Sequence, residues 1–220
     1  FVNLLKASVD NKVKRLVFAS SSSVYGDHPD LPKFEDKIGA QLSPYAVTKY
    51  SKELYAKVFA KTYGIETIGL RYFNVFGRRQ DPDGAYAAVV PLWFKAILNN
   101  EAPFINGDGE TSRDFCYIDN VVQMNVLCGL TDNLDALNQV YNVACGDQTT
   151  LNQLFGYIKN LINPNSNLVP QYRDFRAGDV RHSLADISKA RNLVGYDPKF
   201  NILAGLEHAS AWYKEFFSKL

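Results

Sequence analysis

The chain has 220 residues, 46% of them hydrophobic and 21% charged, with a formal net charge of +1; this composition is typical of a globular protein with one or two domains and a sizeable core. The balanced charge excludes bulk electrostatic attraction to nucleic acid or to an anionic membrane surface, and no apolar run reaches the roughly 18 residues that a membrane-spanning helix needs. The three cysteines and three histidines are scattered, so we expect reduced cysteines, no metal site and a cytoplasmic location.

The first part of the chain predicts a helix followed by a buried strand. Residues 1–7 begin inside an apolar helical pattern without a cap or an initiator methionine, so we expect the complete protein to extend upstream. Residues 14–19 are a short apolar run, typical of a parallel strand, and lead into Ser20-Ser21-Ser22-Ser23-Val24-Tyr25-Gly26. Hydroxyl groups at the carboxyl end of a parallel strand lie where open α/β sheets bind ligands, although a polar turn explains the same serines.

The helix that follows carries the segment Ser43-Pro44-Tyr45-Ala46-Val47-Thr48-Lys49. Ser43 is the expected N-cap and Pro44 the first helical residue. The spacing of four places Tyr45 and Lys49 one turn apart on the same face. Because a cation beside a phenol stabilises the phenolate, the pair is suited to general acid–base catalysis. Taken alone, two such residues are more often part of an ordinary amphipathic helix.

This helix is expected to run to about residue 62 and to stop at Gly64. The residues expected on its apolar face are Tyr50, Leu54, Val58 and Phe59. A strand over 65–73 follows it. A strand, a helix and a second strand in this order predict a right-handed βαβ unit with parallel strands.

Beyond residue 78 the pattern becomes a mixture of short strands, helices and polar turns. The expected strands are 104–106, 113–118, 140–143 and 168–172. The expected helices are 89–99, one capped by Asp119 that ends near 130, 150–162 capped by Thr149, a short one capped by Asp186, and 203–217. The pattern predicts an α/β fold: the C-terminal part of a doubly wound parallel Rossmann sheet with a smaller mixed α/β lobe.

Four motifs occur in a specific order: Ser-Ser-Ser-Ser-Val-Tyr-Gly (20–26), Ser-Pro-Tyr-Ala-Val-Thr-Lys (43–49), Leu-Arg-Tyr-Phe-Asn-Val-Phe-Gly (70–77) and Arg-Asp-Phe-Cys-Tyr-Ile-Asp (113–119). Together they resemble the extended short-chain dehydrogenase/reductases, and within them the UDP-N-acetylhexosamine 4-epimerases of bacterial polysaccharide synthesis. The resemblance implies NAD as the cofactor and a UDP-sugar as the substrate. It also implies a Rossmann domain over 1–80 and 113–147 and a substrate-binding lobe over 81–112 and 148–220.

The resemblance assigns roles to individual residues. Tyr45, Lys49 and Ser21 match the catalytic tyrosine, lysine and serine. The positions that match the cofactor site are Ser20, Tyr45, Lys49, Tyr72 and Phe73. The positions that match the substrate site are Ser21, Ser22, Ser23, Asn74, Gln80, Ala88, Val89, Phe104, Asn106, Arg113, Arg176, Asp179 and Ser183. Arginine is suited to the diphosphate, although a surface ion pair also explains Arg113 and Arg176.

In the mechanism that the resemblance implies, Tyr45 takes the proton of the sugar 4-hydroxyl while a hydride passes from C4 to NAD. The 4-keto sugar then turns, and the hydride returns to its opposite face. Dehydratases and decarboxylases of the group carry an acidic residue just after the catalytic serine or threonine. This chain has Ser22 and Ser23 there, so plain epimerisation is expected. Ser183 stands where a bulky tyrosine would exclude an N-acetyl group, which favours UDP-GlcNAc, UDP-GalNAc or their uronic acids as substrates.

The family's glycine-rich dinucleotide fingerprint does not occur in this sequence. Gly107-Asp108-Gly109 is no substitute, since Ser112 stands where the third glycine would be. Several alternatives therefore stay open. They are a UDP-glucose/UDP-galactose 4-epimerase, another nucleotide-sugar dehydratase or decarboxylase, and a non-catalytic relative or inactive fragment. Members of the group often form homodimers through a four-helix bundle, and Tyr55 and Phe59 could supply such a face, although core packing explains them equally well.

Overall fold

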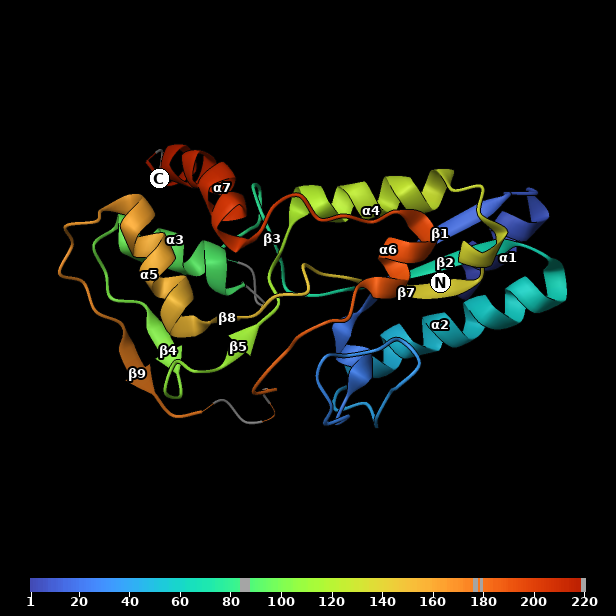
Figure 1. Ribbon diagram of the computed structural model, residues 1–220, viewed down its shortest axis with the longest axis horizontal. Helices are drawn as coiled ribbons and strands as arrows, with labels where there is room; N and C mark the ends of the chain where they lie inside the picture. The colour runs from blue at the N-terminus through green and yellow to red at the C-terminus, as the bar shows by residue number, and fades with distance from the viewer. Residues whose placement is uncertain (84–87, 176–177, 179, 219–220) are drawn as a thin grey trace.

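The computed structural model describes residues 1–83, 88–175, 178 and 180–218, and Figure 1 shows two bodies of secondary structure side by side. The body on the right contains a parallel three-stranded sheet in the order β1 (Arg15–Ser21), β2 (Glu66–Tyr72) and β7 (Gln139–Val143). The chain passes from β1 to β2 through α2 (Pro44–Tyr63). This is the predicted βαβ unit, and it confirms the α/β fold class.

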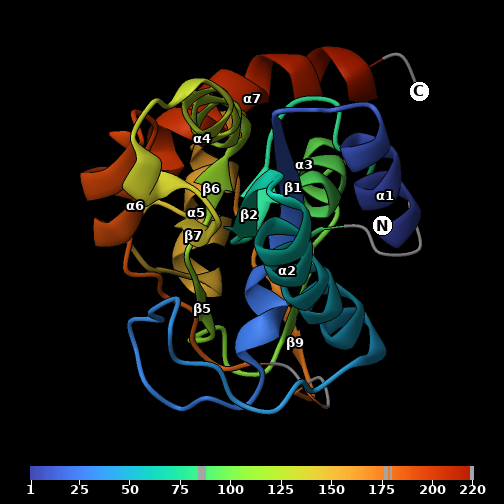
Figure 2. The ribbon, with the colours of Figure 1, turned by 90° about the vertical axis from the view of Figure 1, so that its right-hand side faces the viewer.

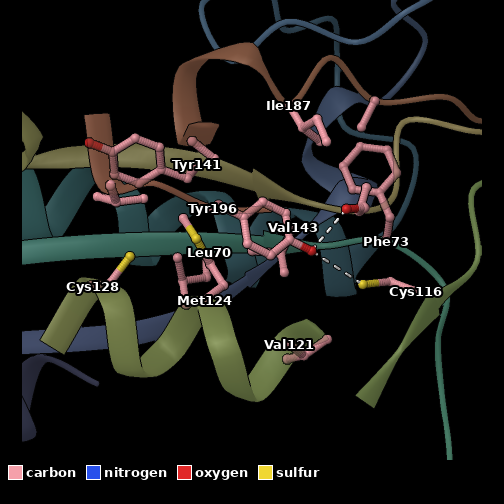
Figure 3. Close-up of a cluster of buried hydrophobic side chains, with 14 of the residues drawn as sticks. Leu70, Phe73, Cys116, Val121, Met124, Cys128, Tyr141, Val143, Ile187 and Tyr196 are labelled. Carbon is pink, nitrogen blue, oxygen red and sulfur yellow. Dashed lines mark hydrogen bonds between the residues drawn. The ribbon is translucent and has the colours of Figure 1, made fainter. Parts of the chain in front are cut away.

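Helices cover both faces of the sheet, as Figure 2 shows. α2 lies on one face with α1 (Val2–Asp10) packed beside it, and α4 (Ile118–Leu130) lies on the other. Figure 3 shows the core of the α4 side, where Tyr196 is fully buried and its hydroxyl donates to the Ala144 carbonyl at 2.9 Å. Among the described residues, no helix is long and apolar enough to span a membrane.

Local signals place α2 as predicted. The hydroxyl of Ser43 accepts a hydrogen bond from the Ala46 backbone N–H at 3.1 Å, Pro44 is the first helical residue, and Gly64 ends the helix with φ of +72°. The predicted apolar face is only partly correct, because Tyr50 and Phe59 are half-buried whereas Leu54 and Val58 are exposed.

The residues that α2 buries are Ala46, Glu53 and Ala56. Small alanines allow the helix to approach the sheet closely, and the buried carboxylate of Glu53 is paired with Arg71 of β2. The larger apolar side chains of α2 are therefore left on its outer face.

The second body, on the left of Figure 1, is built from three helices and short strand pairs. Its helices are α3 (Val89–Leu98), α5 (Leu151–Ile162) and α7 (Ile202–Phe217), and its strands are β4 (Phe104–Asn106), β9 (Gln171–Arg173), β5 (Ser112–Arg113) and β8 (Thr149–Thr150). β4 and β9 pair in parallel. α7 packs against β6 (Cys116–Tyr117), which pairs with β3 (Val75–Phe76). A side chain at Gly205 would meet Phe76 and Tyr117 within 2.8 Å, so glycine permits this close contact.

Several predicted boundaries are corrected. α4 has Tyr117 as its N-cap instead of Asp119, and α5 is capped by Thr150, whose hydroxyl bonds the Gln153 N–H in a capping box. The predicted strand 113–118 divides into β5 and β6, and the edge strand predicted at 168–172 corresponds to β9. The remaining short elements are η1 (Ser22–Tyr25), η2 (Leu134–Ala136) and α6 (Ser188–Val194).

The proposed substrate lobe over 148–220 is not continuous in space. α6 packs against β7, and Ala190, Val194 and Tyr196 belong to the core of the parallel sheet. The chain therefore returns to the first body before it forms α7. Its segment 180–185 passes the carboxyl ends of the strands on the way, which brings Ser183 to the site described below.

Candidate active site

A cavity of about 250 Å³ lies beside the carboxyl ends of β1 and β2. The predicted site residues that line it are Ser22, Ser23, Phe73, Asn74, Arg113 and Ser183. They come from segments far apart in the sequence, so the fold brings together six residues to which the resemblance assigned roles. This wall combines hydroxyl, amide and guanidinium donors with the buried ring of Phe73. We refer to this space as the first cavity.

A second cavity of about 380 Å³ adjoins the first. The predicted residues that line it are Ala88, Val89, Phe104 and Asn106, and it shares Asn74 and Arg113 with the first cavity. Asn74 and Arg113 therefore stand where the two spaces meet. The result is an elongated cleft that suits a ligand with two bulky ends and a polar group between them.

Backbone and side-chain contacts orient the two residues at this junction. Asn74 has a left-handed backbone (φ of +31°), and its side-chain amide donates to the Asp114 carbonyl at 3.2 Å. The Arg113 guanidinium donates to the carbonyls of Ser112 at 2.9 Å and Arg181 at 3.2 Å. These bonds hold a cation and an amide in place beside the cleft.

The N-terminus of α2 borders the first cavity, because Ser43 and Ala46 line it. Tyr45 lies between them and is 56% exposed, and the Lys49 ammonium lies 5.4 Å from the centroid of its ring. The Ser21 hydroxyl, at the end of β1, accepts a hydrogen bond from the Ser23 N–H at 3.2 Å. Tyr45, Lys49 and Ser21 are not themselves among the lining residues of the first cavity, but each lies close in the chain to residues that are.

Three of the predicted residues have other partners. The Ser20 hydroxyl donates to Glu53 at 2.5 Å and the Tyr72 hydroxyl donates to Asn125 at 3.2 Å, so both hydroxyls are engaged inside the fold. Gln80 lines neither part of the cleft but a separate cavity, and its amide donates to the Val75 carbonyl.

Arg176 and Asp179 lie outside the described residues. The predicted substrate-binding residues Ala88 and Ser183 lie in different parts of the cleft: Ala88 lines the second cavity and Ser183 lines the first.

Sequence reasoning missed a buried ion pair behind the site. The Arg71 guanidinium donates to Glu53 at 2.7 and 3.0 Å, and both side chains are almost fully buried. Glu53 also accepts the Ser20 hydroxyl. Burial opposes the charge of Arg71, but its bonds to Glu53 outweigh that effect and raise the arginine pKa. An arginine inside an otherwise apolar strand was the signal that could have revealed this pair.

Each member of this network adjoins a predicted site residue. Ser20 precedes Ser21 in β1, Glu53 follows Lys49 by one helical turn, and Arg71 precedes Tyr72 in β2. The network thus joins the three elements that carry these residues. Arg71 also lies 4.8 Å from the ring centroid of Tyr25, whose pKa burial raises to about 12.

Comparison with known proteins identifies the family. The model of the NAD dependent epimerase/dehydratase family matches residues 1–144. The chain belongs to this family.

Solved structures of relatives have the same fold. A UDP-N-acetylglucosamine 4-epimerase from Methanobrevibacter ruminantium, in complex with UDP-N-acetylmuramic acid, superposes with a TM-score of 0.91 at 41% identity, over 100% of this chain and 68% of that one. A UDP-glucuronic acid 4-epimerase from Bacillus cereus, in complex with UDP-glucuronic acid and NAD, superposes with a TM-score of 0.87 at 31% identity, over 98% of this chain and 66% of that one.

A putative UDP-glucose 4-epimerase from Methanocaldococcus jannaschii is 36% identical over 97% of this chain and 67% of its own length. The chain therefore spans about two thirds of the length of these relatives. The names of these relatives refer to N-acetylglucosamine, glucose and glucuronate. The comparisons therefore show the family of this chain but not which sugar its substrate carries.

Proposed function

We propose that the whole protein catalyses NAD-dependent 4-epimerisation of a UDP-N-acetylhexosamine, such as UDP-GlcNAc and UDP-GalNAc or their uronic acids. The observation that carries this proposal is the cleft itself. Arg113 and Asn74 stand at its middle, serines line one end, and the N-terminus of α2, which carries the Tyr45–Lys49 pair, borders that same end through Ser43 and Ala46. A sugar in the first cavity, a diphosphate at Arg113 and a nucleoside in the second cavity fit this arrangement.

Ser21 at the end of β1 and the Tyr45–Lys49 pair on α2 fit the nicotinamide half of NAD. The hydroxyls of Ser21 and Tyr45 and the Lys49 ammonium are suitable donors for ribose hydroxyls and a carboxamide, and Tyr45 is accessible. When bound, NAD supplies a hydride acceptor and donor for sugar C4.

The proton is handled by the protein. Tyr45 takes it from the sugar 4-hydroxyl and returns it after the transient 4-keto sugar has turned. Lys49 stabilises the phenolate, and Ser21 holds the C4 oxygen.

The first cavity supports a sugar with a 2-acetamido group. Ser183 leaves room beside it, and Ser22 offers a hydroxyl. The Ser23 hydroxyl is buried and has no hydrogen-bond partner within the described ranges, so a substrate oxygen can satisfy it. Neither Ser22 nor Ser23 can act as a carboxylic acid, which argues against dehydration and decarboxylation. The relatives named for glucose and glucuronate keep those 4-epimerases as alternative functions.

The Tyr45→Phe variant tests the mechanism. It removes the acid–base group and should lower the turnover of UDP-GlcNAc to UDP-GalNAc by about 10²–10⁴-fold, with little change in UDP-sugar affinity. Tyr63→Phe is the matched control, since Tyr63 is an exposed tyrosine at the far end of the same helix. Coupled assays and calorimetry on the whole protein measure the two quantities. Full activity of Tyr45→Phe would refute the mechanism.

We also propose that the protein serves polysaccharide or O-antigen synthesis. Separately, we propose a homodimer formed through the outer face of α2. Val47, Leu54, Tyr55 and Val58 give this face an exposed apolar stripe at helical spacing. A monomeric mass in solution would contradict the dimer.

A further inference from the structure

Lys33 is a buried lysine in the loop between β1 and α2. It is 7% exposed, and its backbone is fixed next to the segment that carries Ser183. The Lys33 N–H donates to the Leu184 carbonyl at 2.8 Å, while its own carbonyl accepts from the Asp186 N–H at 3.0 Å and from the Asn142 amide at 2.8 Å. The side chain therefore starts from a rigid point.

The Lys33 ammonium forms no direct ion pair or hydrogen bond with a carboxylate in the part of the chain that the structure describes. It donates to the His28 carbonyl oxygen. The nearby Asp30 is exposed, and its carboxylate lies 4.0 Å from the His28 ring; it attracts the Lys33 ammonium without pairing with it, and this attraction is weaker than the effect of burial. An ammonium has three donors, so one carbonyl does not satisfy it. Burying an unpaired charge is costly, and desolvation accordingly lowers the pKa of Lys33.

Lys33 lines the first cavity together with Ser22, Ser23 and Ser183. It also lines a separate cavity with His28, but it does not line the second cavity, whereas Arg113 lines both the first and the second. The two cations therefore serve different parts of the cleft: Arg113 stands at the junction, where the diphosphate is proposed, and Lys33 stands at the sugar end. A neutral sugar would leave the buried ammonium with only the exposed, unpaired Asp30 as a counter-charge, whereas a carboxylate on the sugar would pair with it directly.

We propose that Lys33 determines specificity by binding a carboxylate carried by the sugar ring, so that the protein prefers an anionic N-acetylhexosamine to a neutral one. This inference rests on the proposed 4-epimerase function. The carboxylate could be at C6, as in a uronic acid, or on a substituent at O3, as in N-acetylmuramic acid. The chemistry at Lys33 is the same for both.

The test compares UDP-GlcNAc, its 6-uronic acid and UDP-N-acetylmuramic acid as substrates of the whole protein. We expect Lys33→Met to lower kcat/KM for the preferred anionic sugar about 10- to 100-fold, mainly through KM, and to leave UDP-GlcNAc turnover within about twofold. Lys33→Arg should retain part of the preference because it keeps the charge. Lys37→Met is the matched control, since Lys37 is an exposed lysine in the same loop.

Binding to the Tyr45→Phe protein separates this inference from the proposed function. If Lys33→Met in that background weakens binding of the anionic sugar nucleotide but not of UDP-GlcNAc, the role of Lys33 is supported even where no turnover is found. Equal affinities with and without Lys33 overturn the inference and leave the 4-epimerase proposal standing. An equal loss for neutral and anionic sugars also overturns it. The thermal midpoint of Lys33→Met should be no lower than that of the parent, because the variant removes a buried charge, and this excludes unfolding as the cause.

Discussion

Single side chains set what can enter the cleft. Ser183 contributes only a hydroxymethyl group to the wall of the first cavity, and its N–H donates to the Ser112 carbonyl at 3.1 Å. That bond ties the position to the start of β5, next to Arg113. A larger side chain at position 183 would have to extend into the cavity, because the backbone at this position cannot move away from the cavity without breaking this hydrogen bond.

The Ser183→Tyr variant tests this steric control. The phenol should fill the space proposed for the acetamido group and lower kcat/KM for UDP-GlcNAc by about 100-fold or more, since excluding a bulky group costs several kcal/mol. Turnover of UDP-glucose should fall much less. Steady-state kinetics with both substrates measure the ratio, and Ser183→Ala serves as the small control. Unchanged turnover of UDP-GlcNAc would contradict the assignment.

Among the secondary-structure elements, α2 is positioned by buried polar contacts as well as by apolar packing. Its buried face carries Glu53, which binds Arg71 of β2 and the Ser20 hydroxyl of β1. A hydrophobic face alone would allow the helix to slide or rotate over the sheet, whereas a paired carboxylate has one favourable position. We infer that this pair sets where Tyr45 and Lys49 lie relative to Ser21.

Replacing Glu53 by Gln leaves the Arg71 charge buried without a counter-ion. The free energy of unfolding should fall by about 3–5 kcal/mol, as measured by urea denaturation. The double variant Glu53→Met/Arg71→Met removes both charges and should recover most of that loss. If the pair positions α2, the double variant will have a reduced kcat despite its recovered stability. A parental kcat in that protein would show that the pair serves stability alone.

For the molecule as a whole, Asp114 connects the two bodies. It follows Arg113, it is fully buried, and its carboxylate accepts backbone N–H groups from Cys145 at 2.9 Å, Gly146 at 3.0 Å and Ala185 at 3.2 Å. These partners lie after β7 and before α6. One carboxylate therefore holds together three segments that meet behind the cleft. Burial outweighs these bonds and raises the pKa of Asp114 to about 6.

This raised pKa predicts a pH dependence of stability. An aspartate in the unfolded chain has a pKa of about 3.9, so between about pH 4 and 6 the folded protein keeps a proton that the unfolded chain has lost. The contribution of Asp114 to the free energy of unfolding should therefore fall as pH rises through this window, by up to about 3 kcal/mol, and stay constant above it.

Urea denaturation at several pH values across this window gives the free energy of unfolding of the parent and of Asp114→Asn. The slope of this free energy against pH should be more negative for the parent. Asp132→Asn, at an exposed carboxylate, is the control. Identical slopes for the parent and Asp114→Asn would show that Asp114 is not the titrating group.

Signals confined to a few neighbouring residues were sufficient for much of the fold. Ser43, Pro44 and Gly64 define both ends of α2 because capping depends on hydrogen bonds and backbone angles within one turn. The strand–helix–strand pattern predicted parallel pairing, and the motifs contain most of the residues that line the first cavity. What failed locally was a shift of one or two residues at caps such as Asp119 and Thr149.

The sequence by itself therefore determined the order of the elements, the ends of α2 and the residue types at the site. Only the tertiary structure decided which face of α2 is buried, how α6 returns to the sheet, and which cations lie at which end of the cleft. Burial of Glu53, Arg71 and Lys33 depends on partners many positions away in the chain. No local periodicity records such a contact, since the energy of a buried charge is set by whatever surrounds it in space.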